Sequence, residues 1–145
     1  MKRKIVIGLA VLVIVIFAVV CTLSWIGCER AIHPKTEVSL YKLSQYSLTV
    51  EEVRFKTRDG LTLAGWFIPG TNGATVILVH GRESTRHEML PHAYYLNTDG
   101  FSVLLYDSRS RGESEGNAVT YGAKEKWDIE AAMDYLKIRN EEVPF

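Results

Sequence analysis

The sequence of 145 residues has few of the side chains that build disulfide or metal frameworks: it contains two cysteines and four histidines. Cys21 and Cys28 lie seven residues apart, which in a helix is about 10 Å along the axis and too far for a disulfide bond. The histidines are scattered, and no spacing typical of metal ligands occurs. We therefore expect no disulfide, no metal ion and no cofactor.

The chain also lacks an excess of charge of either sign, because 17 basic side chains balance 17 acidic ones. No basic stripe alternates with aromatic residues, so the charges do not indicate a nucleic acid partner. Internal repeats and low-complexity segments are absent as well. These absences leave one small globular domain as the expected content of most of the chain.

One long hydrophobic run is present, and it lies near the N-terminus. Ile5 to Ile26 is a stretch of 22 residues without a charged side chain, long enough as a helix to cross the roughly 30 Å hydrocarbon core of a bilayer. Three basic residues, Lys2, Arg3 and Lys4, precede the run, whereas the charges after it nearly balance. This asymmetry predicts a single-pass anchor in the cell membrane, with a cytoplasmic N-terminus and the remaining chain on the exported side.

Two alternatives to an uncleaved anchor stay open. A cleaved signal peptide has an apolar core of about 7–15 residues, which is shorter than this run. A lipoprotein-type cut before Cys28 is favoured by the small Gly27, but Trp25 fits such a site poorly.

The hydrophobic pattern divides the chain into an anchor at residues 1–27, a tether at 28–48 and a globular part at 49–145. Alternating residues at 50–57 and 61–68, joined by the turn signal of residues 58–60, predict a β-hairpin. Runs that are apolar on both faces, at 75–79 and 102–106, predict buried parallel strands.

Two helices are expected to cover these strands. The first spans residues 86–98 with Pro91 in its first turn, and it completes a right-handed βαβ unit. The second spans residues 121–139 and has an apolar stripe that would face the sheet. The stripe is formed by Trp127, Ala131, Tyr135 and Ile138, with Ala132 and Leu136 alongside.

Short motifs follow both buried runs. His80-Gly81 comes directly after residues 75–79, and residues 107–116 read Asp-Ser-Arg-Ser-Arg-Gly-Glu-Ser-Glu-Gly after residues 102–106. In order and spacing these motifs resemble the loops after the third and fourth strands of the α/β-hydrolase fold, over roughly residues 50–139. The resemblance implies an α/β fold in which the hairpin and the parallel βαβ strands form part of a hydrolase sheet with flanking helices, preceded by one transmembrane helix.

The resemblance also assigns roles to loop residues. The backbone N–H of Arg82 would donate to the oxyanion of a serine hydrolase, while Gly81 lets the chain turn and His80 bonds loop backbone. A structural loop of the site would be formed by Asp107, Arg109, Gly112, Ser114 and Gly116. Relatives commonly have glycine where this chain has Ser110, which would cost about 1 kcal/mol if that position needs a positive φ.

Ser114 lies at the centre of Gly112 to Gly116, which matches Gly-x-Ser-x-Gly, the pattern around a hydrolase nucleophile. A nucleophile follows its strand directly, but here the strand ends near Tyr106, and the carboxylates of Glu113 and Glu115 would oppose an oxyanion. We therefore interpret Ser114 as a loop residue. A nucleophilic Ser114, alone or in a site with Asp107 and His80, is the alternative.

In the family the nucleophile, the acid and the catalytic histidine follow the second covering helix. The resemblance therefore predicts the N-terminal part of a membrane-anchored serine hydrolase that transfers a small acyl group from an ester, thioester or amide to water. Without those three residues the chain itself is expected to be inactive. The alternative function is a non-catalytic, membrane-tethered binding domain of the same ancestry.

Overall fold

The computed structural model describes residues 2–33 and 39–139, which belong to two separate units, Met1–His33 and Pro34–Phe145. The first unit is one helix, α1 (Lys2–Ile32), which continues past residue 27, where we expected the anchor to end. It is long and apolar enough to cross a membrane, and its apolar side chains are exposed. A signal sequence would have the same properties.

The second unit contains a four-stranded sheet. Its strands are β1 (Glu51–Lys56), β2 (Thr62–Ile68), β3 (Thr75–Val79) and β4 (Ser102–Tyr106), arranged in the order β1-β2-β4-β3. β1 and β2 form the expected antiparallel hairpin, β2 also pairs antiparallel with β4, and β3 runs parallel to β4. The mixed sheet with flanking helices confirms the predicted partial α/β-hydrolase fold.

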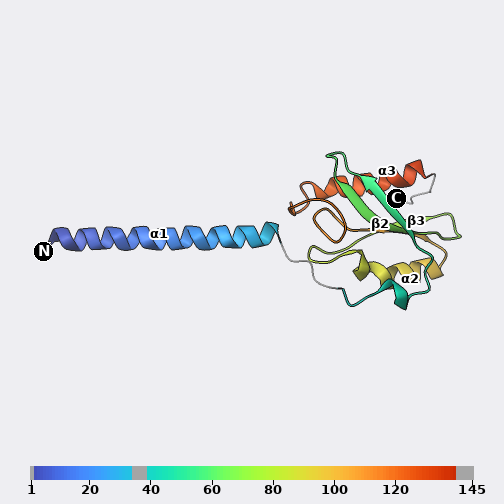
Figure 1. Ribbon diagram of the computed structural model, residues 1–145, viewed down its shortest axis with the longest axis horizontal. Coiled ribbons are helices and arrows are strands. Elements are labelled where there is room, and N and C mark those ends of the chain that lie inside the picture. Colours follow the sequence, from blue (N-terminus) through green and yellow to red (C-terminus); the bar gives the residue numbers. More distant parts are fainter. Residues whose placement is uncertain (1, 34–38, 140–145) are drawn as a thin grey trace. The chain divides into compact units, whose positions relative to one another are not determined.

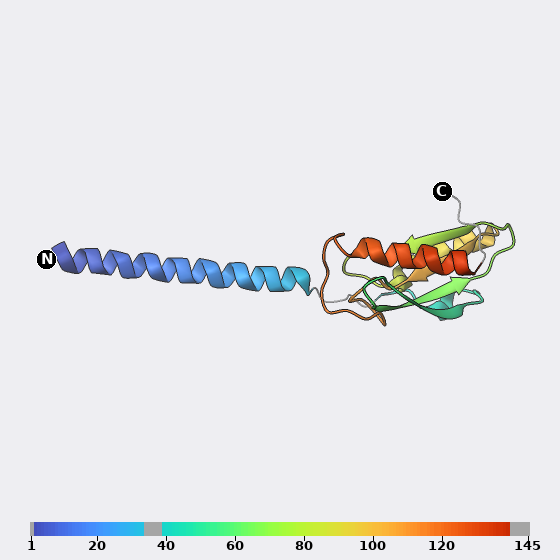
Figure 2. The ribbon, with the colours of Figure 1, turned by 90° about the horizontal axis from the view of Figure 1, so that it is seen from above.

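Helices cover both faces of this sheet (Figures 1 and 2). Between β3 and β4 the chain forms a short 3₁₀ helix, η2 (Arg86–Met89), and then α2 (Leu90–Thr98), with Pro91 in the first turn. α3 (Glu125–Ile138) lies on the opposite face. The βαβ connection places the ends of β3 and β4, and therefore the loops after them, at the same edge of the sheet.

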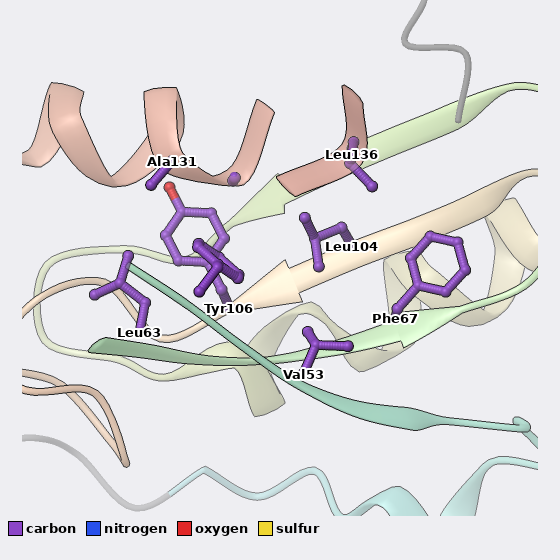
Figure 3. Packing of buried hydrophobic residues seen from close by; sticks show 9 residues of the cluster. Val53, Leu63, Phe67, Leu104, Tyr106, Ala131 and Leu136 are labelled. Atoms are coloured by element: carbon purple, nitrogen blue, oxygen red, sulfur yellow. The ribbon is translucent and has the colours of Figure 1, made fainter. Parts of the chain in front are cut away.

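The core has one layer under each helix. Under α3, side chains from three strands pack against the helix, and Figure 3 shows this layer. Its buried residues include Phe55, Leu63, Phe67, Leu104, Tyr106, Ala132 and Leu136. Under α2 the buried layer consists of Trp66, Ile68, Leu90, Ala93, Val103 and Leu105.

α3 differs from the sequence-based expectation in its start and in its packed face. It begins at Glu125 because Tyr121 and Gly122 have φ values of 52° and 95°, which a right-handed helix cannot contain. Ile138, expected on the packed stripe, is 83% exposed, whereas Asp128 is fully buried. The face that meets the sheet is therefore rotated toward Asp128.

The segment that we expected to be a tether is in part folded onto the globular unit. A 3₁₀ turn, η1 (Leu43–Gln45), precedes β1, and Leu43, Tyr46 and Leu48 pack against the core layer under α2. The chain therefore packs on the folded unit from residue 43, within the segment expected to be a tether.

Candidate functional site

The loops after β3 and β4 meet the segment before α3 around a cavity of about 240 Å³. The lining residues from the first two loops include His80, Gly81, Arg82, Ser108, Arg109 and Arg111, and those from the third segment include Tyr121 and Glu125. The carboxyl ends of parallel strands are the usual place for a ligand site in an open α/β sheet. The cavity is therefore the candidate active site.

His80 is held in the wall of this cavity by its two ring nitrogens. The backbone N–H of Ser108 donates to Nε2 at 3.0 Å, and Nδ1 lies 2.7 Å from the Gly81 carbonyl oxygen, to which it can donate. Burial lowers the pKa of His80 below its usual range, so the ring is neutral with its proton on Nδ1. Both nitrogens are engaged in joining the loops after β3 and β4.

Arg82 is exposed, and its backbone N–H donates no hydrogen bond to any group in the described part of the chain. The Arg111 side chain holds the Arg82 carbonyl through an Nε–H donor at 2.6 Å, which fixes the peptide from its other side. The Arg82 guanidinium pairs with Glu83 and lies 5.7 Å from the ring centre of Tyr121. A backbone donor that the described residues leave unpaired, on a residue that lines a cavity, is available to a bound ligand.

Ser114 lies in the loop after β4 and is bound on both sides by backbone. Its hydroxyl donates to the carbonyl of Asp107 and accepts from the N–H of Ala64 at 2.9 Å. The strand β4 ends at Tyr106, and no helix starts at Ser114. Both ring nitrogens of His80 bond other groups, the Ser108 N–H and the Gly81 carbonyl. Within the described residues, no hydrogen bond joins Ser114 to an imidazole.

Asp107 is fully buried and bonds two segments. Its carboxylate accepts from the Arg86 backbone N–H at 2.7 Å, from the Arg86 guanidinium at 2.8 Å and from the Glu113 N–H at 3.0 Å. Arg86 is itself 2% exposed, and its guanidinium lies 4.4 Å from the ring centre of Trp66. Asp107 and Arg86 thus hold the start of η2 against the loop after β4.

The sequence did not indicate a role for Arg86, which we had placed at the start of an expected helix. Its pairing with Asp107 spans 21 residues of sequence. A charged residue at a helix start is usually exposed, so no local pattern could have singled out Arg86.

The loop from Ser110 to Gly116 depends on unusual backbone conformations. Ser110 has a φ of 62°, so this position does need a positive φ, and its hydroxyl donates to the Ala118 carbonyl at 2.9 Å. Gly112 has a φ of 49° and lies against the Asp107 carboxylate so closely that a Cβ would overlap it. Glycine at position 112 therefore allows the loop to wrap around Asp107.

Arg109 joins this loop to α3 and to the β1–β2 turn. Its backbone N–H and side chain bind Asp128 in α3, with a shortest distance of 2.7 Å, and its guanidinium also binds Asp59 at 2.9 Å. Burial opposes the charge, but the hydrogen bonds to the two carboxylates raise the pKa of Arg109 above its ordinary value. Sequence reasoning missed Asp128, although it lies three and four residues before Ala131 and Ala132, on the packed face of α3.

The pairing of Asp59 with Arg109 predicts a pH dependence of stability. Hydrogen bonds from Arg109 and Thr57 lower the pKa of Asp59 from 3.8 to about 2. A lowered folded-state pKa stabilises the fold at pH values above the unfolded-state pKa. This stabilisation is lost as the pH falls through about 2. In urea unfolding, the stability difference between wild type and Asp59→Asn should therefore shrink between pH 5 and pH 2, and a constant difference would contradict the ion pair.

The chain is 32% identical to an esterase of Pyrococcus furiosus, Pf2001, with a TM-score of 0.68, covering 74% of this chain and 42% of the esterase. It is 29% identical to the α/β hydrolase GrgF of Penicillium sp. sh18, with a TM-score of 0.57, covering 67% of this chain and 35% of GrgF.

Among curated proteins, the thiohydrolase aneE of Aspergillus aculeatus is 41% identical over 70 residues, 47% of this chain and 22% of that protein. No protein-family model matches the chain. The chain spans half or less of the length of the curated relatives it matches, from 22% of the thiohydrolase to 49% of a mycobacterial relative.

Proposed function

We propose that this chain, which has a partial α/β-hydrolase fold, supplies the oxyanion side of a membrane-anchored serine hydrolase. The substrate would be a small ester, thioester or amide whose acyl group is transferred to water. An esterase and a thiohydrolase are among the similar proteins, which supports acyl transfer as the reaction class.

The observation that carries this proposal is the open N–H of Arg82. Arg82 directly follows His80-Gly81 at the end of β3, its carbonyl is fixed by Arg111, and the residue lines the cavity. A donor fixed before the substrate arrives does not have to reorganise when negative charge develops on the carbonyl oxygen. Asp107, Arg109, Gly112, Ser114 and Gly116 would act by holding the surrounding loops in place.

The nucleophile is proposed to be a residue other than Ser114. The Ser114 hydroxyl donates to the Asp107 carbonyl and accepts from the Ala64 N–H, and the carboxylates of its two neighbours bind other donors. Glu113 pairs with Arg86, and Glu115 accepts from the Thr62 N–H at 2.6 Å. A hydroxyl held in this way has no base to take its proton.

Labelling of the 145-residue chain with a fluorophosphonate tests this assignment. We expect no covalent label, with Pf2001 esterase as the positive control for the reagent. A label that disappears in Ser114→Ala would show that Ser114 is the nucleophile and would overturn the proposal. A label that persists in Ser114→Ala would point to a different reactive side chain within this chain and would equally contradict us.

α1 would anchor the hydrolase-like unit in the cell membrane, with the basic N-terminus in the cytoplasm. The competing function is a membrane-tethered binding domain without catalysis. The coding sequence after Phe145 distinguishes the two: a second Gly-x-Ser-x-Gly within roughly 20 residues, at the start of a helix, favours the hydrolase. A stop codon at that point favours the binding domain.

A further inference from the structure

Four tyrosines gather on one surface of the hydrolase-like unit: Tyr41, Tyr46, Tyr94 and Tyr95, which we call the tyrosine cluster. The ring centres of Tyr46 and Tyr94 are 5.7 Å apart, and those of Tyr94 and Tyr95 are 5.8 Å apart. Burial and the neighbouring hydroxyls of Tyr41 and Tyr95 raise the pKa of Tyr46, because both groups lie close to it. The cluster thus joins the segment before β1 to α2.

Much of this aromatic surface is open to solvent. Tyr95 is 70% exposed, Tyr41 and Tyr94 are each 38% exposed, and the adjacent Leu40 is 86% exposed. Tyr46 instead packs against the core layer under α2 and holds the cluster to the unit. Several large aromatic side chains gathered on an exposed surface indicate an interaction site.

The chain leaves the folded unit at this cluster. Leu43, Tyr46 and Leu48 pack on the core, whereas Leu40 and Tyr41, two or three residues before Leu43, belong to the exposed surface. Tyr41 follows Ile32, the last residue of α1, by nine residues. Nine residues reach at most about 30 Å even when fully extended, so the connection between α1 and the cluster is short.

We propose that the tyrosine cluster contacts the surface of the phospholipid bilayer that α1 enters. Tyrosine is favoured at the membrane interface, where its ring meets the acyl boundary and its hydroxyl bonds the headgroups. The short connection keeps the cluster at a high effective concentration near the bilayer, so that weak contacts by a few rings are sufficient. This inference rests on the membrane anchoring proposed above.

Spin labelling of the full chain in phosphatidylcholine nanodiscs tests the contact. With Cys21 and Cys28 replaced by alanine, His92→Cys places a single label on exposed α2, one turn before Tyr95, and leaves all four tyrosines in place. Collision of the label with oxygen, which dissolves in lipid, is compared with collision with a water-soluble nickel complex. The matched control is Ile138→Cys, an 83% exposed position on α3, which lies on the opposite face of the sheet.

The oxygen-to-nickel ratio at position 92 is expected to be several-fold higher than at position 138. Changing the three exposed tyrosines to serine, as Tyr41→Ser, Tyr94→Ser and Tyr95→Ser, should lower the ratio at position 92 to that at position 138. Circular dichroism should show an unchanged fold, because Tyr46 keeps its place in the core.

A third label, Val15→Cys, separates this inference from the anchoring itself. If position 15 is lipid-exposed but position 92 is as open to water as position 138, the bilayer contact is overturned and the anchor stands. If position 15 is open to water, both proposals fail. If position 92 is shielded from both reagents, a protein covers the cluster and the assignment to lipid is overturned.

Discussion

Asp107→Asn should lower the free energy of unfolding by about 3–5 kcal/mol, the usual cost of removing one partner from a buried ion pair. The carboxylate and the Arg86 side chain are each at most 3% exposed and lie 2.8 Å apart. Asparagine would also turn an amide nitrogen, which cannot accept, toward N–H groups of Arg86 or Glu113 that now donate to the carboxylate. Urea unfolding of the full chain in detergent, followed by tryptophan fluorescence, measures this effect.

The matched control for this substitution is Asp134→Asn. Asp134 pairs with Lys137 at 3.0 Å on α3, but both side chains are about two thirds exposed. Such surface pairs contribute between about 0 and 1 kcal/mol, so the control should change stability little. If both variants lost the same free energy of unfolding, burial of Asp107 and Arg86 would not explain how much their ion pair contributes to stability.

The strands of this fold could be predicted from sequence because each depends on a local pattern. The runs at 75–79 and 102–106 are apolar on both faces, and they form β3 and β4 with those bounds. The start of α3 could not be predicted in the same way. Tyr121 has a positive φ that nothing in its side chain indicates, and the four residues 121–124 form turns before the helix begins.

The candidate site was only partly predictable for a related reason. His80, Arg82 and Asp107 follow strand ends, and the topology brings their loops together. The groups that hold these loops, Arg86 and Asp128, lie on helices, and each pairs with a residue about 20 positions away. Burial of a charge depends on its partner, so a pattern along a single helix does not show it.

The second large effect is expected at Arg109. Arg109→Met leaves the fully buried carboxylate of Asp128 without its cation and should lower the free energy of unfolding by about 3–5 kcal/mol. Burial already raises the pKa of Asp128, and removal of the guanidinium raises it further. A folded-state pKa above the unfolded value stabilises the fold at low pH, and this stabilisation is lost as the pH rises and Asp128 ionises. The cost of Arg109→Met should therefore be greater at pH 8 than at pH 5.

A double variant separates the energetic cost of the unpaired charge from the cost of lost packing. Arg109→Met combined with Asp128→Leu removes both charges, and apolar replacements of a buried ion pair are often neutral or stabilising. The double variant should therefore recover most of the stability lost in Arg109→Met, and its unfolding free energy should no longer depend on the protonation of Asp128. If the double variant is as unstable as the single one, the main contribution of Arg109 is its bond to Asp59 in the β1–β2 turn, because that bond is absent from both variants.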